Sequence, residues 1–184
     1  MKKTFIIIGV IVVLIALYSF ATYNSLITLG VSADAQWKQV ETTYQSRFDL
    51  IPNLVSSVKG IMKQEQAVFT AIADARTKYS GATTPDDKAK AATQVEGALG
   101  RLLVITENYP QLKSSETVQT LMSQLEGTEN RIRVERMRFN EMIGKYNLKI
   151  KRVPSSIIAK MFGFSLREYF NADAAASKAP QVVI

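Results

Sequence analysis

Two polar blocks hold the residues of this 184-residue chain that are best suited to acid and base chemistry. They are Arg47, Asp49 and Asn53 in the first block, and Glu129, Asn130 and Arg131 in the second. Charged groups beside apolar helical faces can form a catalytic site. Asp49 and Glu129, taken as an acid and base pair, define a hydrolase hypothesis.

The rest of the composition argues against that hypothesis. The chain contains no cysteine and no histidine, which removes thiol nucleophiles, Ser-His triads and the usual zinc and haem ligands. No glycine-rich phosphate loop of a common pattern occurs. The two carboxylates therefore lack a nucleophile, an oxyanion donor and a metal ligand. We predict no enzyme activity and no cofactor or metal, and we interpret the six polar residues as a structural cluster that caps helices and fixes their register.

An uncharged run from Phe5 to Tyr23 precedes both blocks. As a helix, these nineteen residues extend about 28 Å, close to the thickness of the hydrocarbon layer of a membrane. The alternative is a secretory signal peptide, but signal cores are shorter and residues 19–21 make a poor cleavage site. We predict a single-pass anchor over residues 1–23.

The basic residues around this run predict its orientation. Lys2 and Lys3 precede it, and no Lys or Arg occurs in residues 4–37. Positive charge favours the cytoplasmic side of a membrane, so we expect a cytoplasmic N-terminus and a folded domain on the other side.

The remainder of the chain shows helical periodicity, with apolar residues every three or four positions. The pattern predicts helices over residues 26–51, 54–79, 86–105 and 115–150, and a short helix over 155–162. Short connections between such helices favour antiparallel neighbours. We predict an all-α chain in which the anchor continues into an antiparallel up-and-down four-helix bundle, residues 24–171, with a flexible tail, 172–184.

The first connection has two interpretations. Pro52 lacks an amide hydrogen and disfavours helical angles at Ile51. We favour a hairpin at residues 49–53, and the alternative is a continuous helix with a kink at Pro52.

Positive charge is concentrated in residues 131–152, which contain eight basic and two acidic residues. The predicted topology brings Lys149, Lys151 and Arg152 near lipid headgroups, where each can gain about 1 kcal/mol from an anionic surface. The alternative is an ordinary solvated face. The predicted orientation argues against nucleic acid as a partner.

Aromatic residues supply further contact candidates. Phe162 and Phe164 fit either the core or a surface that contacts the membrane or another copy. Trp37 is a further candidate for contact between copies.

Several short motifs are spread over nearly the whole chain. They are Tyr23, Asn24 and Leu26; Arg47; Asp49 to Leu54; Tyr109 and Pro110; Glu126 to Ile132; Phe139 and Asn140; Tyr146 and Asn147; and Pro154 to Phe164. In these motifs the chain resembles the LemA family of bacterial membrane proteins. The resemblance implies a four-helix bundle tethered to the bacterial cytoplasmic membrane, with no established catalytic activity. A relative takes part in forming magnetosome membranes, which suggests membrane organisation.

Two functional hypotheses follow. The first is a non-enzymatic, membrane-anchored bundle that assembles with copies of itself, with heptad spacing typical of coiled coils, and organises or remodels the bilayer. The second is an adaptor or regulator of another membrane protein, such as a protease or transport complex.

Overall fold

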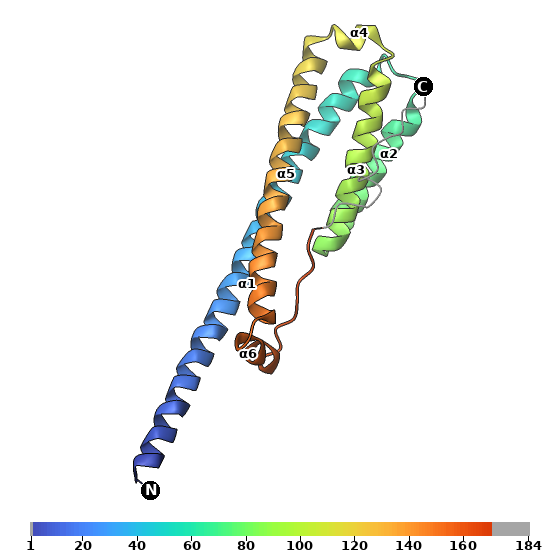
Figure 1. The fold of residues 1–184 in the computed structure, drawn as a ribbon. Coiled ribbons are helices and arrows are strands. Elements are labelled where there is room, and N and C mark those ends of the chain that lie inside the picture. The colour runs from blue at the N-terminus through green and yellow to red at the C-terminus, as the bar shows by residue number, and fades with distance from the viewer. Residues whose placement is uncertain (1, 171–184) are drawn as a thin grey trace, which may run out of the picture. The chain divides into compact units, whose positions relative to one another are not determined.

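The computed structural model describes residues 2–170, and these residues form six helices and no strand. The helices are α1 (Lys2–Lys59), α2 (Gln66–Gly81), α3 (Pro85–Thr106), α4 (Pro110–Lys113), α5 (Glu116–Lys151) and α6 (Ser155–Met161) (Figure 1). The all-helical prediction is confirmed. The predicted tail, residues 172–184, lies outside the described residues.

The predicted hairpin at residues 49–53 is wrong, because α1 continues through Pro52 to Lys59. Pro52 removes one backbone hydrogen bond, but Ile51 and Leu54 on either side of it are both buried, so apolar packing holds the helix together. The chain turns instead after Gly60, where the amide of Met62 donates to the carbonyl of Val58 (2.9 Å). The predicted second helix is thus divided between α1 and α2.

The later helices begin where local chemistry satisfies their first amides. Thr84 caps α3, since its hydroxyl accepts from the amide of Asp87 (3.1 Å) and donates to the carboxylate of the same residue (2.7 Å). Pro85 occupies the first turn, where its missing N–H costs nothing. Ser115 precedes α5, which begins one residue after the predicted start, and its hydroxyl lies 3.5 Å from the amide of Val118. The short helix α4 was not predicted.

The contacts divide the chain into two compact units, and α1 and α5 contribute to both. In the second unit, residues 39–136 with Phe170, side chains from α1, α2, α3 and α5 form an apolar core. An aromatic group lies inside it: the Phe48 ring meets Tyr79 at 4.6 Å, and Tyr44 meets Tyr79 at 5.5 Å, between ring centroids. Such pairs add about 0.5–1.5 kcal/mol beyond area burial.

The first unit comprises residues 1–38 and 137–169. Its core contains Leu26 of α1, Tyr146 of α5 and Ala159 of α6, with Phe164 packed beside them. These residues attach α6 and the segment after it to the two long helices. Residues 5–18 of α1 lie outside this core and are exposed to solvent.

Candidate functional site

Three helices meet at a polar network in the second unit. The hydroxyl of Tyr44 on α1 donates to Glu96 on α3 (3.0 Å). The guanidinium of Arg136 on α5 donates to the same carboxylate oxygen and to the Tyr44 hydroxyl, and it lies 4.4 Å from the ring centroid of Phe170. Charge-assisted bonds of this kind are stronger than neutral ones, so the network ties α1, α3 and α5 together at one level.

Two further ion pairs link the same helices. Arg47, which is buried on α1, pairs with Glu129 of α5, and Lys88 of α3 pairs with Glu41 of α1. The Nε atoms of Arg47 and Arg136 are buried without a hydrogen-bond partner in the described part of the chain. The network is therefore incompletely satisfied, which makes it sensitive to the loss of any partner.

Burial sets the protonation states in this network. Burial raises the pKa of the Glu96 carboxyl above its usual value of 4.5, while the guanidinium of Arg136 opposes that rise. Burial, together with the carboxylate of Glu96, also raises the pKa of Tyr44. The Tyr44 hydroxyl consequently stays protonated at neutral pH and remains a donor. The arrangement is suited to fixing helix register.

The raised pKa of Glu96 predicts a measurable pH dependence of stability. A carboxyl that binds its proton more tightly in the folded state favours folding below pH 4.5, and that contribution is lost as pH rises through the folded-state pKa. The relevant quantity is the difference in the free energy of unfolding between the natural chain and Glu96→Gln. We expect this difference to fall as pH rises above about 4.5. Urea unfolding of both proteins across this range measures the difference. A difference that grows with pH would contradict the assignment.

The structure brings together only part of the predicted polar cluster. Arg47 and Glu129 form an ion pair. Asp49 is exposed and accepts a hydrogen bond from Gln45 on the same helix (2.8 Å). The remaining members, Asn53, Asn130 and Arg131, are also exposed, and the Asn130 side chain accepts from Arg133 (2.9 Å). Asp49 and Glu129 thus have different environments and different partners.

The sequence interpretation missed Glu96 and the role of Arg136. A signal for Glu96 was present, because it lies four residues after Ala92 and three before Leu99, both buried. A carboxylate on the apolar face of a helix requires a partner. The position of Arg136 on α5, four residues after Ile132 and three before Phe139, carries the same signal.

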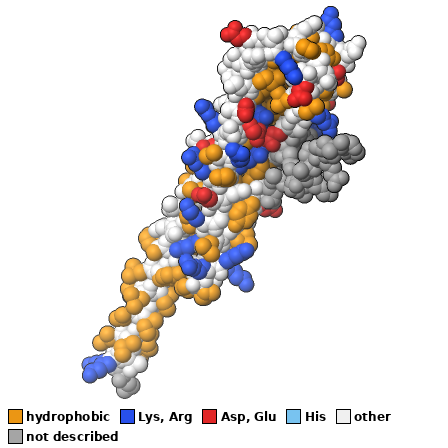
Figure 2. Space-filling view, turned by 45° about the horizontal axis from the view of Figure 1, so that its top comes forward, with side chains coloured by type: hydrophobic (Ala, Val, Ile, Leu, Met, Phe, Trp, Pro, Cys, Tyr) orange, Lys and Arg blue, Asp and Glu red, His pale blue; other side chains and the backbone are white. Residues whose placement is uncertain are grey.

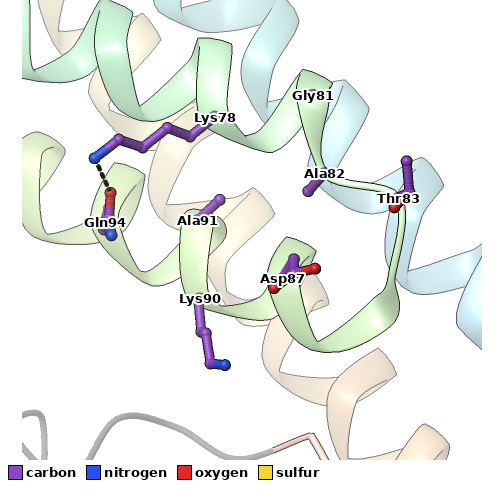
Figure 3. Close-up of a pocket in the computed structure, with 8 residues that line it drawn as sticks. All are labelled: Lys78, Gly81, Ala82, Thr83, Asp87, Lys90, Ala91 and Gln94. Carbon is purple, nitrogen blue, oxygen red and sulfur yellow. Dashed lines mark hydrogen bonds between the residues drawn. The ribbon is translucent and has the colours of Figure 1, made fainter.

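A hollow also lies at the turn between α2 and α3 (Figure 3). Its lining residues are Lys78, Gly81, Ala82, Thr83, Asp87, Lys90, Ala91 and Gln94. Lys78 donates to Gln94 (3.1 Å), and Lys90 pairs with Asp86 (2.6 Å). The carboxylate of Asp87 accepts a hydrogen bond from the hydroxyl of Thr84, which caps α3. The charged groups are thus engaged with neighbours on the same two helices.

The first unit contains the predicted contact aromatics. Trp37 is buried with its ring 5.2 Å from that of Phe139, which leaves little of it for contact with another molecule. Phe162 and Phe164 lie 5.0 and 5.6 Å from the ring of Tyr23 on α1. Phe162 nevertheless remains half exposed. These aromatic contacts hold α6 against α1.

A buried amide holds the segment that follows α6. Asn147 of α5 donates to the carbonyl of Arg167 (2.8 Å) and accepts from the amide of the same residue (2.9 Å). The Arg167 guanidinium reaches α1, where it donates to Asp34 (2.5 Å) and to the carbonyl of Gly30 (3.3 Å). It also lies 5.1 Å from the ring centroid of Tyr146. The segment is thereby joined to both long helices.

The basic residues predicted to meet headgroups surround the α5–α6 turn. Lys151 and Arg152 are exposed, and Lys149 is partly exposed. Figure 2 shows Lys and Arg side chains gathered at one end of the apolar N-terminal part of α1. Lys2 and Lys3 lie in the first turn of α1, at its other end.

The chain is a helical protein in which one described helix, α1, contains a stretch long and apolar enough to cross a membrane. The LemA family model matches residues 36–183, so the chain belongs to the LemA family. The family prediction is confirmed. Family membership and the apolar part of α1 together indicate a membrane-associated helical protein.

Similar proteins come from two organisms. Magnetosome proteins MamQ 1 and MamQ 2 of Paramagnetospirillum magneticum are 29% identical over 174 residues, which is 80% of this chain. Magnetosome protein MamQ of Magnetospirillum gryphiswaldense is 29% identical over 175 residues, 81% of this chain. In each comparison the match covers 64% of the relative's length.

Proposed function

We propose that this protein is a non-enzymatic, membrane-anchored helical bundle that assembles with copies of itself and organises or remodels the bilayer. The observation that carries the proposal is the continuity of α1, which runs without a break from its apolar N-terminal part into the core of the folded chain. An unbroken helix joins the apolar segment to the folded part of the chain without a flexible linker between them. The similarity to magnetosome proteins supports a role at membranes.

The proposal includes an antiparallel four-helix arrangement. Contacts between α1 and α5 support it. Arg47 of α1 pairs with Glu129 of α5, whereas Tyr44, which lies earlier on α1, contacts Arg136, which lies later on α5. The two helices therefore run in opposite directions at these contacts. The α2–α3 connection, residues 82–84, is short, which favours antiparallel neighbours. The proposed location is the bacterial cytoplasmic membrane, with the N-terminus in the cytoplasm and the bundle outside, supported by Lys2 and Lys3.

An exposed apolar stripe on α1 supports contact between copies. It consists of Phe20, Ile27 and Val31, spaced seven and four residues apart and therefore on one face of the helix. Ile27 is 43% exposed and Val31 is 61% exposed, although both lie beyond the end of the apolar run at Tyr23. Lateral association of anchored copies would remove Ile27 and Val31 from water.

Electron microscopy of the full-length protein in mild detergent tests the proposal. We expect large, uniform assemblies that are lost when residues 1–23 are deleted. We also expect Val31→Glu to yield smaller particles with unchanged helix content, because a charge in the stripe must be desolvated at the contact. Gln39→Glu adds a charge off the stripe and should leave the size unchanged. Monomers of the natural chain in both preparations would overturn self-assembly.

The second candidate is an adaptor for another membrane protein, such as a protease or transport complex. An apolar groove along α2 and α3 favours it, lined in part by Val68, Gly97, Gly100 and Val104. Val104 is 65% exposed there. A monomer that copurifies with one partner in fixed ratio would support this candidate over self-assembly.

A further inference from the structure

Helix α6 lies beside the apolar part of α1. A groove of about 410 Å³ separates the two, lined on α1 by residues between Ile11 and Ser19 and on α6 by Pro154, Ile157 and Ile158. At 1.5 Å per residue, Ser19 and Ile11 lie about 6 and 18 Å before the end of the apolar run at Tyr23. If α1 crosses the bilayer along this run, α6 is at the depth of the lipid acyl chains.

The outward face of α6 is apolar, as a position among lipid acyl chains requires. Ile157 and Met161, one helical turn apart, are 65% and 64% exposed, and Val153 before the helix is also exposed. The opposite face is packed, with Ile158 and Ala159 buried in the first unit. These exposed apolar side chains lie beside the apolar part of α1, so they are suited to contact with lipid acyl chains.

The backbone at both ends of α6 is internally hydrogen-bonded, which acyl surroundings demand. At the start, the amides of Ser156 and Ile157 donate to the carbonyls of Arg152 (2.7 Å) and Pro154 (3.2 Å). At the end, Gly163 adopts a positive φ of 74°, and the amide of Phe164 donates to the carbonyl of Ala159 (2.9 Å). This Schellman arrangement satisfies carbonyls that would otherwise need water.

The charged residues near α6 are compatible with immersion. Lys149, Lys151 and Arg152 lie at the α5–α6 turn, and Lys160 is exposed on α6. Long basic side chains extend to the headgroup level while their stems cover apolar surface. Anionic phosphates are the partners such side chains find there.

We propose that α6 is a second membrane-embedded element, immersed in the leaflet on the bundle's side, with a phospholipid acyl chain in the groove between α6 and α1. This inference rests on the anchoring of α1 in the proposed function. It adds a wedge of protein to one leaflet alone, which supplies a physical route from membrane binding to membrane bending.

The absence of cysteine makes a direct test clean, since each single-cysteine variant carries one label. Ile157→Cys, in the full-length chain, receives an environment-sensitive fluorophore and is placed in vesicles of phosphatidylcholine and phosphatidylglycerol. Spin-labelled lipids with the quencher on the acyl chain or on the headgroup then report depth. Val13→Cys marks the apolar part of α1, and Thr83→Cys marks the α2–α3 turn of the second unit.

We expect the label at position 157 to be quenched by acyl-chain spin labels about as strongly as the label at position 13, with a similar blue shift, and the label at position 83 to be unaffected. Quenching at 13 without quenching at 157 would overturn the embedding of α6 and leave the anchor intact. A blue shift at 157 without lipid quenching would assign the α6 face to a protein contact instead. Absence of quenching at 13 would overturn the anchor itself.

Discussion

Replacing Glu96 by leucine is expected to lower the free energy of unfolding by about 3 kcal/mol, because it leaves the charge of Arg136 largely buried without its carboxylate partner. Side chains of this pair are only 22% and 16% exposed. The hydroxyl of Tyr44 loses its acceptor in the same variant. Denaturant unfolding followed by circular dichroism measures the change.

An exposed ion pair provides the matched control. Lys90 and Asp86 on α3 are 62% and 50% exposed, so Lys90→Ala should cost less than about 0.5 kcal/mol. If Glu96→Leu and Lys90→Ala lowered the free energy of unfolding equally, the buried network would contribute no more to stability than an exposed ion pair. Combining Glu96→Leu with Tyr44→Phe and Arg136→Met should restore much of the stability, since no unpaired charge remains.

Replacing Asn147 by alanine is expected to release the segment after α6. The two hydrogen bonds between the Asn147 side chain and the backbone of Arg167 are lost, and both backbone groups are left without that partner. We expect the free energy of local opening to fall by about 3 kcal/mol, a roughly hundredfold faster exchange of the Arg167 amide hydrogen. Hydrogen exchange read by mass spectrometry over residues 163–170 measures it.

Asp34→Asn serves as the comparison, because Asp34 contacts the same arginine from a side chain that is 67% exposed. Its loss should cost less than about 1 kcal/mol. If Asp34→Asn opened the segment as much as Asn147→Ala, the solvent-exposed ion pair, and not the buried amide, would be what holds it.

The path of α1 shows what sequence periodicity can decide. Buried residues continue across Pro52 at steps of three and four, from Phe48 through Ile51 and Leu54 to Val58. A hairpin would have reset the phase of this stripe. The hairpin prediction gave more weight to one missing hydrogen bond than to the unbroken apolar face, although burial of several large side chains is worth more.

The polar residues show the opposite case. The pairing of Arg47 with Glu129 joins positions 82 residues apart, and nothing local in either block specifies it. Asp49 lies two residues from Arg47, yet it points to a different side of α1 because successive helical residues are rotated by about 100°. Membership of a polar block therefore did not determine membership of the buried network.

The sequence by itself determined that this protein is helical, that it belongs to the LemA family and that one helix is long and apolar enough to cross a membrane. These properties depend on local periodicity and composition, which a single chain displays directly. The tertiary structure alone decided which charges meet at Glu96 and that α6 lies against the apolar part of α1. Such contacts depend on how distant helices pack, and side-chain shape and charge fix that packing only once the chain has folded.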